Sequence, residues 1–584
     1  MTSLAAPGPR RTAPAVAARP ARRRVPVGRV LGWGCAVAVP VAFLAVFFAW
    51  PVVVMVGKGF VTDGSLDLSG FADVFSRPRT WRIVGQTLGQ ATAATALSVA
   101  LGVPGAYTLY GRRFPGRAAV RALVTVPFVL PTVVVGVAFR SLLVDGGPLG
   151  FLHLDGTFAA ILAALVFFNY AVVVRAVGGL WERLDPRATQ AARGLGASPW
   201  RAFRTVELPA LAPAIWSAAS LVFLFCATAF GTVLVLGGTR FGTIETEIWI
   251  QTTQFLDLRA AAVLSVVQLV VVVGVLTVAG RARAHRERAL ALTAAPSAVR
   301  PLTLRRRPAD DGHPHALAAA GVTALTLAAI GVPLVNLVVR SLRVDGGWGL
   351  DHYRALGAPA PGVPVSVWQA AATSVETAVD ATVIALVVGG LVAFVVSRRP
   401  RRRAARRAVA GFDALFMLPL GVSAVTVGFG FLVTMDRPLG LAVDLRTSPL
   451  LVPIAQAVVA VPLVVRTVLP VLRAIDPRLR EAASTLGAAP GRVLRTVDVP
   501  LAARSVGLAV GFAFAASLGE FGATSFLARP DRPTLPVMVF RLIGRPGPEN
   551  YGMALAASVV LAGLTAAIVA LAERLRAGQV GGDW

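Results

Sequence analysis

Three acidic side chains stand inside stretches of sequence that are otherwise apolar: Glu376, Asp380 and Glu520. Glu376 and Asp380 are spaced so that they share one face of a helix, one turn apart. Charged groups are costly inside a membrane and usually face a cavity or another charge. These acids can therefore attract a cation along a substrate path, or they can pair with arginines or become protonated in a packed interface.

Motifs for catalysis or for a bound cofactor are missing from the sequence. Lys58 is followed by Gly59, and no Gly-Lys-Ser/Thr phosphate loop or Gly-x-Ser-x-Gly elbow occurs. Cys35 and Cys226 lie in separate apolar stretches and predict neither a disulfide framework nor a cysteine metal site. An integral-membrane enzyme is the weaker alternative, because the acids have no partnering nucleophile. The histidines show no metalloprotease spacing: His153, His285, His313, His315 and His352.

The segment between the fourth and fifth expected helices is predicted to form two short capped helices joined by a sharp turn. We call this arrangement an elbow. Asp185-Pro186 supplies an N-cap and a first helical residue. An alanine-rich turn favours helix, and a glycine after it supplies the left-handed residue that ends the helix. Ser198-Pro199 starts a second helix by the same chemistry. The motif residues of this segment are Gln190, Ala191, Ala192, Gly196, Leu208 and Pro209.

A matching segment follows Asp476-Pro477 in the second half of the chain. Two adjacent alanines expose a flat surface, and the glycine permits a corner, so a partner's cleft can grip each segment as a rigid lever. The motif residues of the second segment are Glu481, Ala482, Ala483, Gly487, Val499 and Pro500.

The composition places the chain in a lipid bilayer. Hydrophobic residues make up 56% of its 584 residues, and its formal net charge is +28. A soluble protein is less apolar than this. The arginines cluster in short runs between apolar stretches of about 20 residues, a length that crosses the hydrocarbon core as a helix. We therefore expect the basic runs to orient membrane helices, and we expect no nucleic-acid partner.

About twelve apolar stretches have this length, which predicts an all-α integral membrane protein. Basic runs such as Arg22–Arg24 and Arg398–Arg407 alternate with acidic loops, so the positive-inside rule predicts a multi-pass cell-membrane protein with both termini in the cytoplasm. The stretches fall near residues 31–57, 84–110, 119–143, 157–180, 214–237, 260–281, 316–341, 370–396, 408–434, 449–472, 503–527 and 553–573.

The chain repeats itself. Asp185-Pro186 recurs as Asp476-Pro477, 291 positions later (476 − 185). The same offset relates Gly196 to Gly487, Pro209 to Pro500, and Phe230-Gly231 to Phe521-Gly522. Each half has an even number of crossings, so the two six-helix copies are parallel repeats. We expect a basic cytoplasmic tail over 1–30, a first repeat over 31–283 with its core at 82–282, a cytoplasmic linker over 284–314, and a second repeat over 315–584 with its core at 369–575.

The two elbow segments resemble the EAA loop of ABC-importer permeases, in which Glu-Ala-Ala is followed by a glycine, a β-branched residue and an apolar-Pro pair. Both copies keep the spacing, with Val206 and Val497 at the β-branched position. Gln190 replaces the glutamate in the first copy, so a role that needs the carboxylate is in doubt there. The resemblance covers roughly residues 82–282 and 369–575 and implies two fused domains with the type I importer permease fold.

What the resemblance implies is a transport subunit that hydrolyses nothing itself. The elbows are then coupling helices that insert into a cytoplasmic ABC ATPase dimer, which uses ATP and Mg. An extracytoplasmic solute-binding protein delivers a small solute, and membrane lipids surround the chain. The residues alone leave open a secondary transporter, since that class also has two parallel six-helix halves, but such a carrier has no reason to keep two capped elbows.

Fused double permeases of this size resemble the thiamine and iron(III) importer branch. Segments that carry this resemblance are Phe230–Leu234, Ser517–Gly522 and Thr534–Pro536. Within this branch, the segment Leu236–Gly238 followed by Thr243–Glu245 favours thiamine over iron as the solute. Both solutes are cationic, so we expect the three intramembrane acids to line an asymmetric path. Their counterparts in the first repeat carry no charge: Gln90, Ala94 and Ala229.

Overall fold

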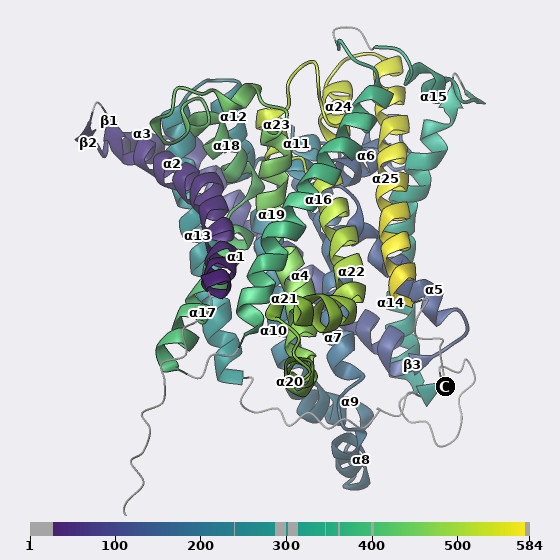
Figure 1. The fold of residues 1–584 in the computed structure, drawn as a ribbon. Helices are drawn as coiled ribbons and strands as arrows, with labels where there is room; N and C mark the ends of the chain where they lie inside the picture. Colours follow the sequence, from purple (N-terminus) through teal and green to yellow (C-terminus); the bar gives the residue numbers. More distant parts are fainter. Residues whose placement is uncertain are drawn as a thin grey trace, which may run out of the picture.

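The computed structural model describes residues 27–62, 64–238, 240–286, 300–301, 313–344, 346–359, 363–398 and 402–577. These residues form helices joined by loops, together with three two-stranded ladders (Figure 1). Most of the basic tail and most of the expected linker lie outside the described residues. The ladders pair β1 (Val61–Thr62) with β2 (Ser65–Leu66), β3 (Arg112–Arg113) with β4 (Arg300–Pro301), and β5 (Arg343–Val344) with β6 (Gly347–Trp348).

The first half of the chain runs from α1 to α13. Its helical elements are α1 (Val27–Leu44), the π-helical turn η1 (Ala45–Ala49), α2 (Trp50–Phe60), α3 (Ser69–Ser76), α4 (Pro78–Gly111), α5 (Arg117–Val129), α6 (Thr132–Leu143), the 3-10 turn η2 (Gly150–Leu152), α7 (Phe158–Trp181), α8 (Pro186–Gly194), α9 (Pro199–Ala202), the π-helical turn η3 (Phe203–Glu207), α10 (Leu208–Ala227), α11 (Gly231–Leu236), α12 (Ile244–Thr253) and α13 (Leu258–Arg286).

The second half runs from α14 to α25. Its helical elements are α14 (His313–Ser341), α15 (Asp351–Ala355), α16 (Val367–Ser397), α17 (Arg403–Met417), the 3-10 turns η5 (Leu418–Gly421), η6 (Pro438–Gly440) and η7 (Leu445–Thr447), α18 (Ala424–Thr434), α19 (Leu451–Ala474), α20 (Pro477–Thr485), α21 (Pro490–Val493), the π-helical turn η8 (Leu494–Asp498), α22 (Val499–Leu518), α23 (Thr524–Leu527), α24 (Leu535–Ile543) and α25 (Pro548–Ala577).

The helices confirm the expected all-helical membrane class. Within the described ranges, nine helical segments are long and apolar enough to cross a bilayer, and up to eleven are if each bent pair counts as one span. The bent pairs are α5 with α6, at 102°, and Gly491–Ala503 with Ser505–Leu518, at 62°. The stretch expected at 408–434 is not among them, because η5 separates α17 from α18.

Proline explains where α5 gives way to α6. A proline disfavours helical geometry in the residue before it, and Leu130, which precedes Pro131, is extended at φ −67° and ψ 140°. Pro419 lies in η5 at the equivalent place in the second half. There, Leu418 before the proline stays helical at φ −58° and ψ −41°, and the chain becomes extended only at Val422. Apolarity predicted one continuous helix in each region, whereas each is divided into two shorter pieces. Both breaks lie beside the opposite repeat.

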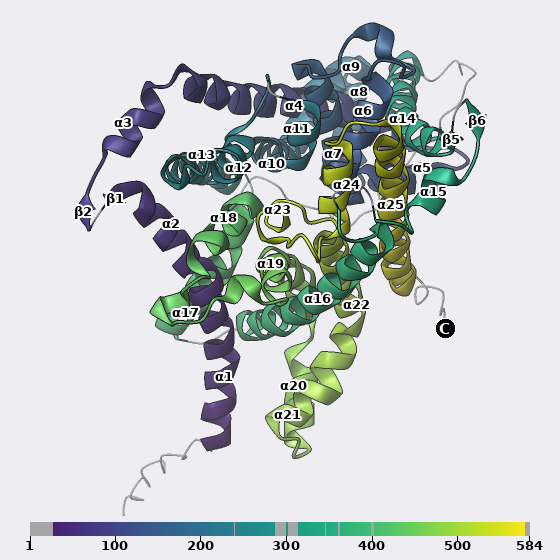
Figure 2. The same ribbon diagram turned by 90° about the horizontal axis from the view of Figure 1, so that it is seen from above.

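The two halves exchange their first helices. Helix α14 opens the second half but packs against α4 and α6 of the first, and α1 packs against α16 of the second half. The long pairs α4 with α7 and α16 with α19 form the centre of each half. Figure 2 shows α14 beside the first-half helices and α1 running along the second half. The repeats are therefore interlocked along their length.

Glycines allow these long helices to approach closely. A Cβ built on Gly105 would lie 2.2 Å from the Tyr170 hydroxyl, and one on Gly136 would lie 2.8 Å from the Cβ of Val235. Small residues at helix contacts are the usual device for close packing in membranes. The contact with Val235 gives Gly136 a packing role.

Gly389 and its neighbour Gly390 provide a test of this packing. A Cβ on Gly389 would lie 2.9 Å from the Cβ of Val464 on α19, whereas one on Gly390 meets nothing within 4 Å. We predict that Gly389→Ala lowers the thermal unfolding midpoint of the purified protein, at a cost of about 1–3 kcal/mol from overpacking. Gly390→Ala, the matched control, should raise the midpoint slightly, because alanine favours helix over glycine. Equal midpoints for both variants would contradict the close α16–α19 contact.

Candidate coupling elbows and the junction between the repeats

The elbow of the first half is fixed at both ends by hydrogen bonds. The Asp185 carboxylate accepts from the backbone N–H of Arg187 at 2.9 Å, which satisfies a free donor at the start of α8. Gly196 has a φ of +85°, which favours glycine, and the following N–H of Ala197 donates to the carbonyl of Ala192 at 3.1 Å. The predicted helix, reversal and second helix are all present.

The elbow of the second half has the same geometry. Asp476 accepts from the backbone N–H of Arg478 at 2.9 Å, and Gly487 has a φ of +81°. The N–H of Ala488 then donates to the carbonyl of Ala483 at 3.0 Å. Figure 1 shows α8, α9 and α20 at the same end of the molecule. The two elbow segments thus adopt the same geometry and lie at the same end of the molecule.

The turn of each elbow presents an exposed leucine. Leu195 is 90% exposed and Leu486 is 88% exposed, although leucine is ordinarily buried. Gln190 and Glu481 are exposed on the preceding helices. Neither leucine was among the residues predicted to function here, although each lies directly before the turn glycine. An apolar tip on a rigid elbow is a surface suited to a protein partner.

The other motif residues lie partly or wholly at the surface. The alanine pairs combine an exposed Ala191 or Ala482 with a half-buried Ala192 or Ala483. Leu208-Pro209 and Val499-Pro500 begin α10 and α22, the helices that follow the elbows. Of these, Leu208 is half-buried, and the following residues are exposed: Pro209, Val499 and Pro500.

Each elbow continues into a membrane helix without a loop. In the first half α9, η3 and α10 form one helical segment, Pro199–Ala227. In the second half η8 joins α21 to α22 with helical geometry on both sides. Each elbow is thus joined to the next membrane helix by continuous backbone, which in the second half includes the 62° bend between Ala503 and Ser505.

A buried ion-pair network anchors the second elbow. Asp498 is 1% exposed and lies 2.6 Å from Arg480 and 3.0 Å from Arg398. Burial lowers the pKa of the Arg398 guanidinium, and the nearby Asp498 carboxylate opposes that change. The network joins α20, η8 and the end of α16, so it fixes the elbow to the membrane helices.

The three intramembrane acids do not form one cluster. Glu376 is exposed and pairs with Arg532 at 2.7 Å, while Asp380 is half-buried one turn further along α16. Glu520 is buried and accepts from the backbone N–H groups of Ala523 and Thr524 at 2.8 and 3.0 Å. Its carboxylate caps the short helix α23. Among the described residues, no hydrogen bond or ion pair joins Glu520 to the other two acids.

Another acid, Glu245, is buried in contact with the opposite repeat. Its side chain is fully buried at the start of α12, and it accepts from the Ser423 hydroxyl of the second half at 2.6 Å. Among the described residues, no group lies within good hydrogen-bond geometry of the other carboxylate oxygen, and the amide of Gln268 is close by. The sequence analysis used Glu245 only as part of a family-like segment. Its burial against Ser423 depends on contact between the repeats, which no local pattern reveals.

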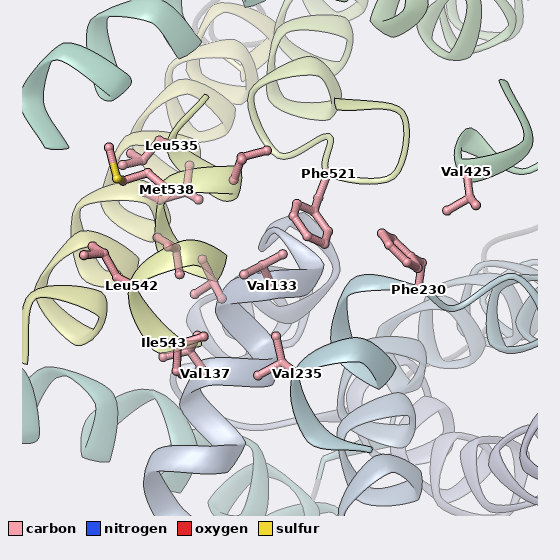
Figure 3. Packing of buried hydrophobic residues seen from close by; sticks show 14 of the residues in the cluster. Val133, Val137, Phe230, Val235, Val425, Phe521, Leu535, Met538, Leu542 and Ile543 are labelled. Atoms are coloured by element: carbon pink, nitrogen blue, oxygen red, sulfur yellow. The ribbon is translucent and has the colours of Figure 1, made fainter. Parts of the chain in front are cut away.

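Two equivalent phenylalanines stack where the repeats meet. Phe230 and Phe521 occupy the same position in the two copies, and their ring centroids are 5.3 Å apart with an 18° angle between planes. Figure 3 shows the two rings facing each other, with Val425 of α18 beside Phe230 and Val133 of α6 nearby. Glu520 directly precedes Phe521. The break between α10 and α11 and the break between α22 and α23 therefore meet at this aromatic pair, which we call the junction.

The chain resembles known membrane permeases along most of its length. The Thiamine transport system permease protein ThiP of Brucella abortus (strain 2308) is 27% identical over 513 residues, which cover 85% of this chain and 88% of that protein. ThiP of Escherichia coli (strain K12) is 28% identical over 474 residues, or 80% and 84% of the two chains. A probable ABC transporter permease protein, y4fN of Sinorhizobium fredii, is 26% identical over 95% of this chain and 98% of its own.

A crystal structure of a bacterial ABC transporter involved in the import of the acidic polysaccharide alginate aligns with 45% of this chain and 97% of its own. The TM-score is 0.39 and the identity is 16%. A family model described as the inner membrane component of binding-protein-dependent transport systems matches twice, at residues 97–286 and 385–578. Each match contains one elbow. The chain therefore belongs to the family of binding-protein-dependent transport system inner membrane components, the non-catalytic membrane subunits of ABC importers.

Proposed function

We propose that this permease moves thiamine inward by alternating access, with α8–α9 and α20–α21 as its coupling elements. The observation that carries the coupling assignment is the presence of two equivalent, rigid elbows at one end of the molecule (Figure 1). A permease driven by a pair of ATPase subunits needs two such contacts. A secondary transporter, the alternative left by the residues alone, does not.

We assign the elbow end to the cytoplasm and the opposite end to the exterior. The elbows carry arginine-rich segments, including Arg183–Arg204 and Arg473–Arg495, as the positive-inside rule requires. By the same rule both chain termini are cytoplasmic. The ATPase dimer then docks on the elbows, and the solute-binding protein docks on the end that carries α15 and α24.

In the proposed cycle, closure of the ATPase dimer draws the two elbows together. The motion passes through η3 and η8 into α10 and α22, which end beside Phe230 and Phe521. Separation of that aromatic pair opens the junction to solute. Nucleotide and solute drive this change only if each binds the two states unequally.

Thiamine is the solute favoured by the relatives, because ThiP proteins match more than three quarters of this chain. The acids support a cationic solute, since a carboxylate in a low-dielectric site attracts a cation more strongly than in water. Glu520 and Glu245 lie at the junction, whereas Glu376 and Asp380 lie along α16. We place the first two at the centre of the path and the other two at its outer entrance.

The coupling assignment predicts loss of ATPase binding when the elbow carries a charge. Ala482→Asp and Leu486→Asp place a carboxylate on exposed positions of the second elbow. We expect ATPase co-purification and solute uptake to fall to about a tenth or less, as for central interface residues. Leu441→Asp, at an exposed leucine before the start of α19 and away from the elbows, should leave ATPase binding unchanged. Normal uptake with a normally bound ATPase in both elbow variants would remove the assignment.

The two elbows should differ in their sensitivity to charge. Glu481 and Gln190 are both exposed and occupy equivalent positions. If Glu481 pairs with a basic group of the ATPase, Glu481→Gln should reduce transport-coupled ATP hydrolysis several-fold, and Gln190→Glu should be tolerated. The measurement is ATPase activity of the reconstituted importer with its binding protein. An equal loss at both positions would show that neither side chain acts through its charge.

The acids are tested by uptake of labelled thiamine into vesicles that hold matched amounts of importer. We predict that Glu520→Gln and Glu376→Gln lower uptake while membrane insertion and ATPase association remain normal, with the larger loss at the buried Glu520. Glu549→Gln, an exposed acid at the start of α25, is the control. Unchanged uptake in the two test variants would mean that these acids are structural. Wild-type transport of ferric iron in place of thiamine would overturn the solute assignment itself.

A further inference from the structure

A cavity of about 600 Å³ lies beside the first elbow, away from the junction between the repeats. This volume is within the range of about 300–1,000 Å³ that small-molecule sites occupy. Membrane-spanning helices form its apolar walls, and the elbow closes one end. The apolar walls include Val99 and Val103 of α4, Leu208 and Ile215 of α10, and Ala319 and Val322 of α14.

Arg112 lines the elbow end of this cavity and is 5% exposed. Its guanidinium donates to the Tyr107 hydroxyl and lies 5.2 Å from the centre of that ring. Both contacts are with a neutral group. No carboxylate among the described residues forms an ion pair with Arg112. A buried cation without an anion is unfavourable unless something else compensates its charge.

The second repeat shows how the equivalent arginine is compensated. Arg398 occupies the matching place after α16 and lies 3.0 Å from the buried Asp498, which also binds Arg480. Thr189 replaces Arg480 in the first repeat, and it lines the cavity. Glu207 occupies the position of Asp498 and also lines the cavity. No ion pair between Glu207 and Arg112 is found among the described residues, and the cavity lies between these positions where the second repeat has a direct ion pair.

Two further charges line the cavity, and they offset each other. Arg193 of α8 and Glu207 of η3 carry opposite charges. Among the described residues that line the cavity, Arg112 therefore leaves one net positive charge at the end of an apolar pocket. The complementary ligand is an anionic amphiphile, with an acidic head group for the guanidinium and an acyl chain for the walls of α4, α10 and α14.

We propose that this cavity binds an anionic lipid, with its phosphate on Arg112 and one acyl chain between α4, α10 and α14. The site adjoins the coupling elbow through an aromatic series. The ring of Tyr107 contacts Trp181 at 5.4 Å, Trp181 stacks on Phe203 at 6.0 Å, and Phe203 stacks on Trp200 at 5.5 Å. A bound lipid thus stiffens the first elbow, a support that the ion pairs provide in the second. This inference is independent of the transported solute.

Native mass spectrometry of the delipidated full-length chain tests the proposal. The probes are dioleoylphosphatidylglycerol, the zwitterionic dioleoylphosphatidylcholine and oleate. We expect the wild-type chain to bind one phosphatidylglycerol about tenfold more tightly than phosphatidylcholine. A hydrogen bond to a charged group contributes about a tenfold gain in affinity. Arg112→Gln should abolish this preference. Arg113→Gln removes the exposed neighbouring arginine and should retain it.

A second pair of variants tests the acyl-chain end of the site without touching the arginine. Ala319→Trp fills the cavity from α14 and should remove the bound lipid, whereas Val332→Trp, on an exposed part of the same helix, should not. Equal binding of both phospholipids by the wild-type chain would overturn the proposal, as would full lipid binding by Arg112→Gln or Ala319→Trp. Binding of oleate alone, in an Arg112-dependent way, would assign the site to a fatty acid and overturn the phospholipid assignment.

Discussion

Backbone groups that leave a helix in apolar surroundings must find new hydrogen-bond partners, and this requirement shapes the centre of the molecule. Where α22 ends, the Glu520 carboxylate caps α23. Where α17 ends, Ser423 caps α18 and also binds Glu245 of the other repeat. The Thr232 hydroxyl donates to the carbonyl of Thr132 at the break before α6. These side chains thus permit the broken helices, and the bond between Ser423 and Glu245 also joins the two repeats.

The two repeats share a fold but differ in how they support their elbows. The second elbow is anchored by Asp498 and its arginines, whereas the first adjoins an aromatic series and a cavity. The buried acids are also uneven: Glu245 corresponds to Pro536 in the other copy, and Glu520 corresponds to Ala229. Fusion of the two copies in one chain allows such differences, because each half always meets the same partner.

Local chemistry made the elbows predictable from sequence. An N-cap aspartate, a following proline and a left-handed glycine act within about one turn, so their geometry needs no tertiary contact. The helices were predictable where apolar length alone decides. The length of an apolar stretch does not reveal the proline break before α6, so a continuous helix was predicted there. Glu245 and Arg112 escaped notice because their surroundings are set by which helices tertiary packing brings together.

The exchange of first helices has a consequence for biosynthesis. When α14 leaves the ribosome, its partners α4 and α6 are already in the membrane and can receive it. Helix α1 is in the opposite position, since α16 is made long after it. Until then its insertion depends on partition into lipid, which the apolar span Gly34–Phe60 favours. Assembly of the permease is therefore completed only when the second half arrives, and α1 meets its partner α16 long after it has entered the membrane.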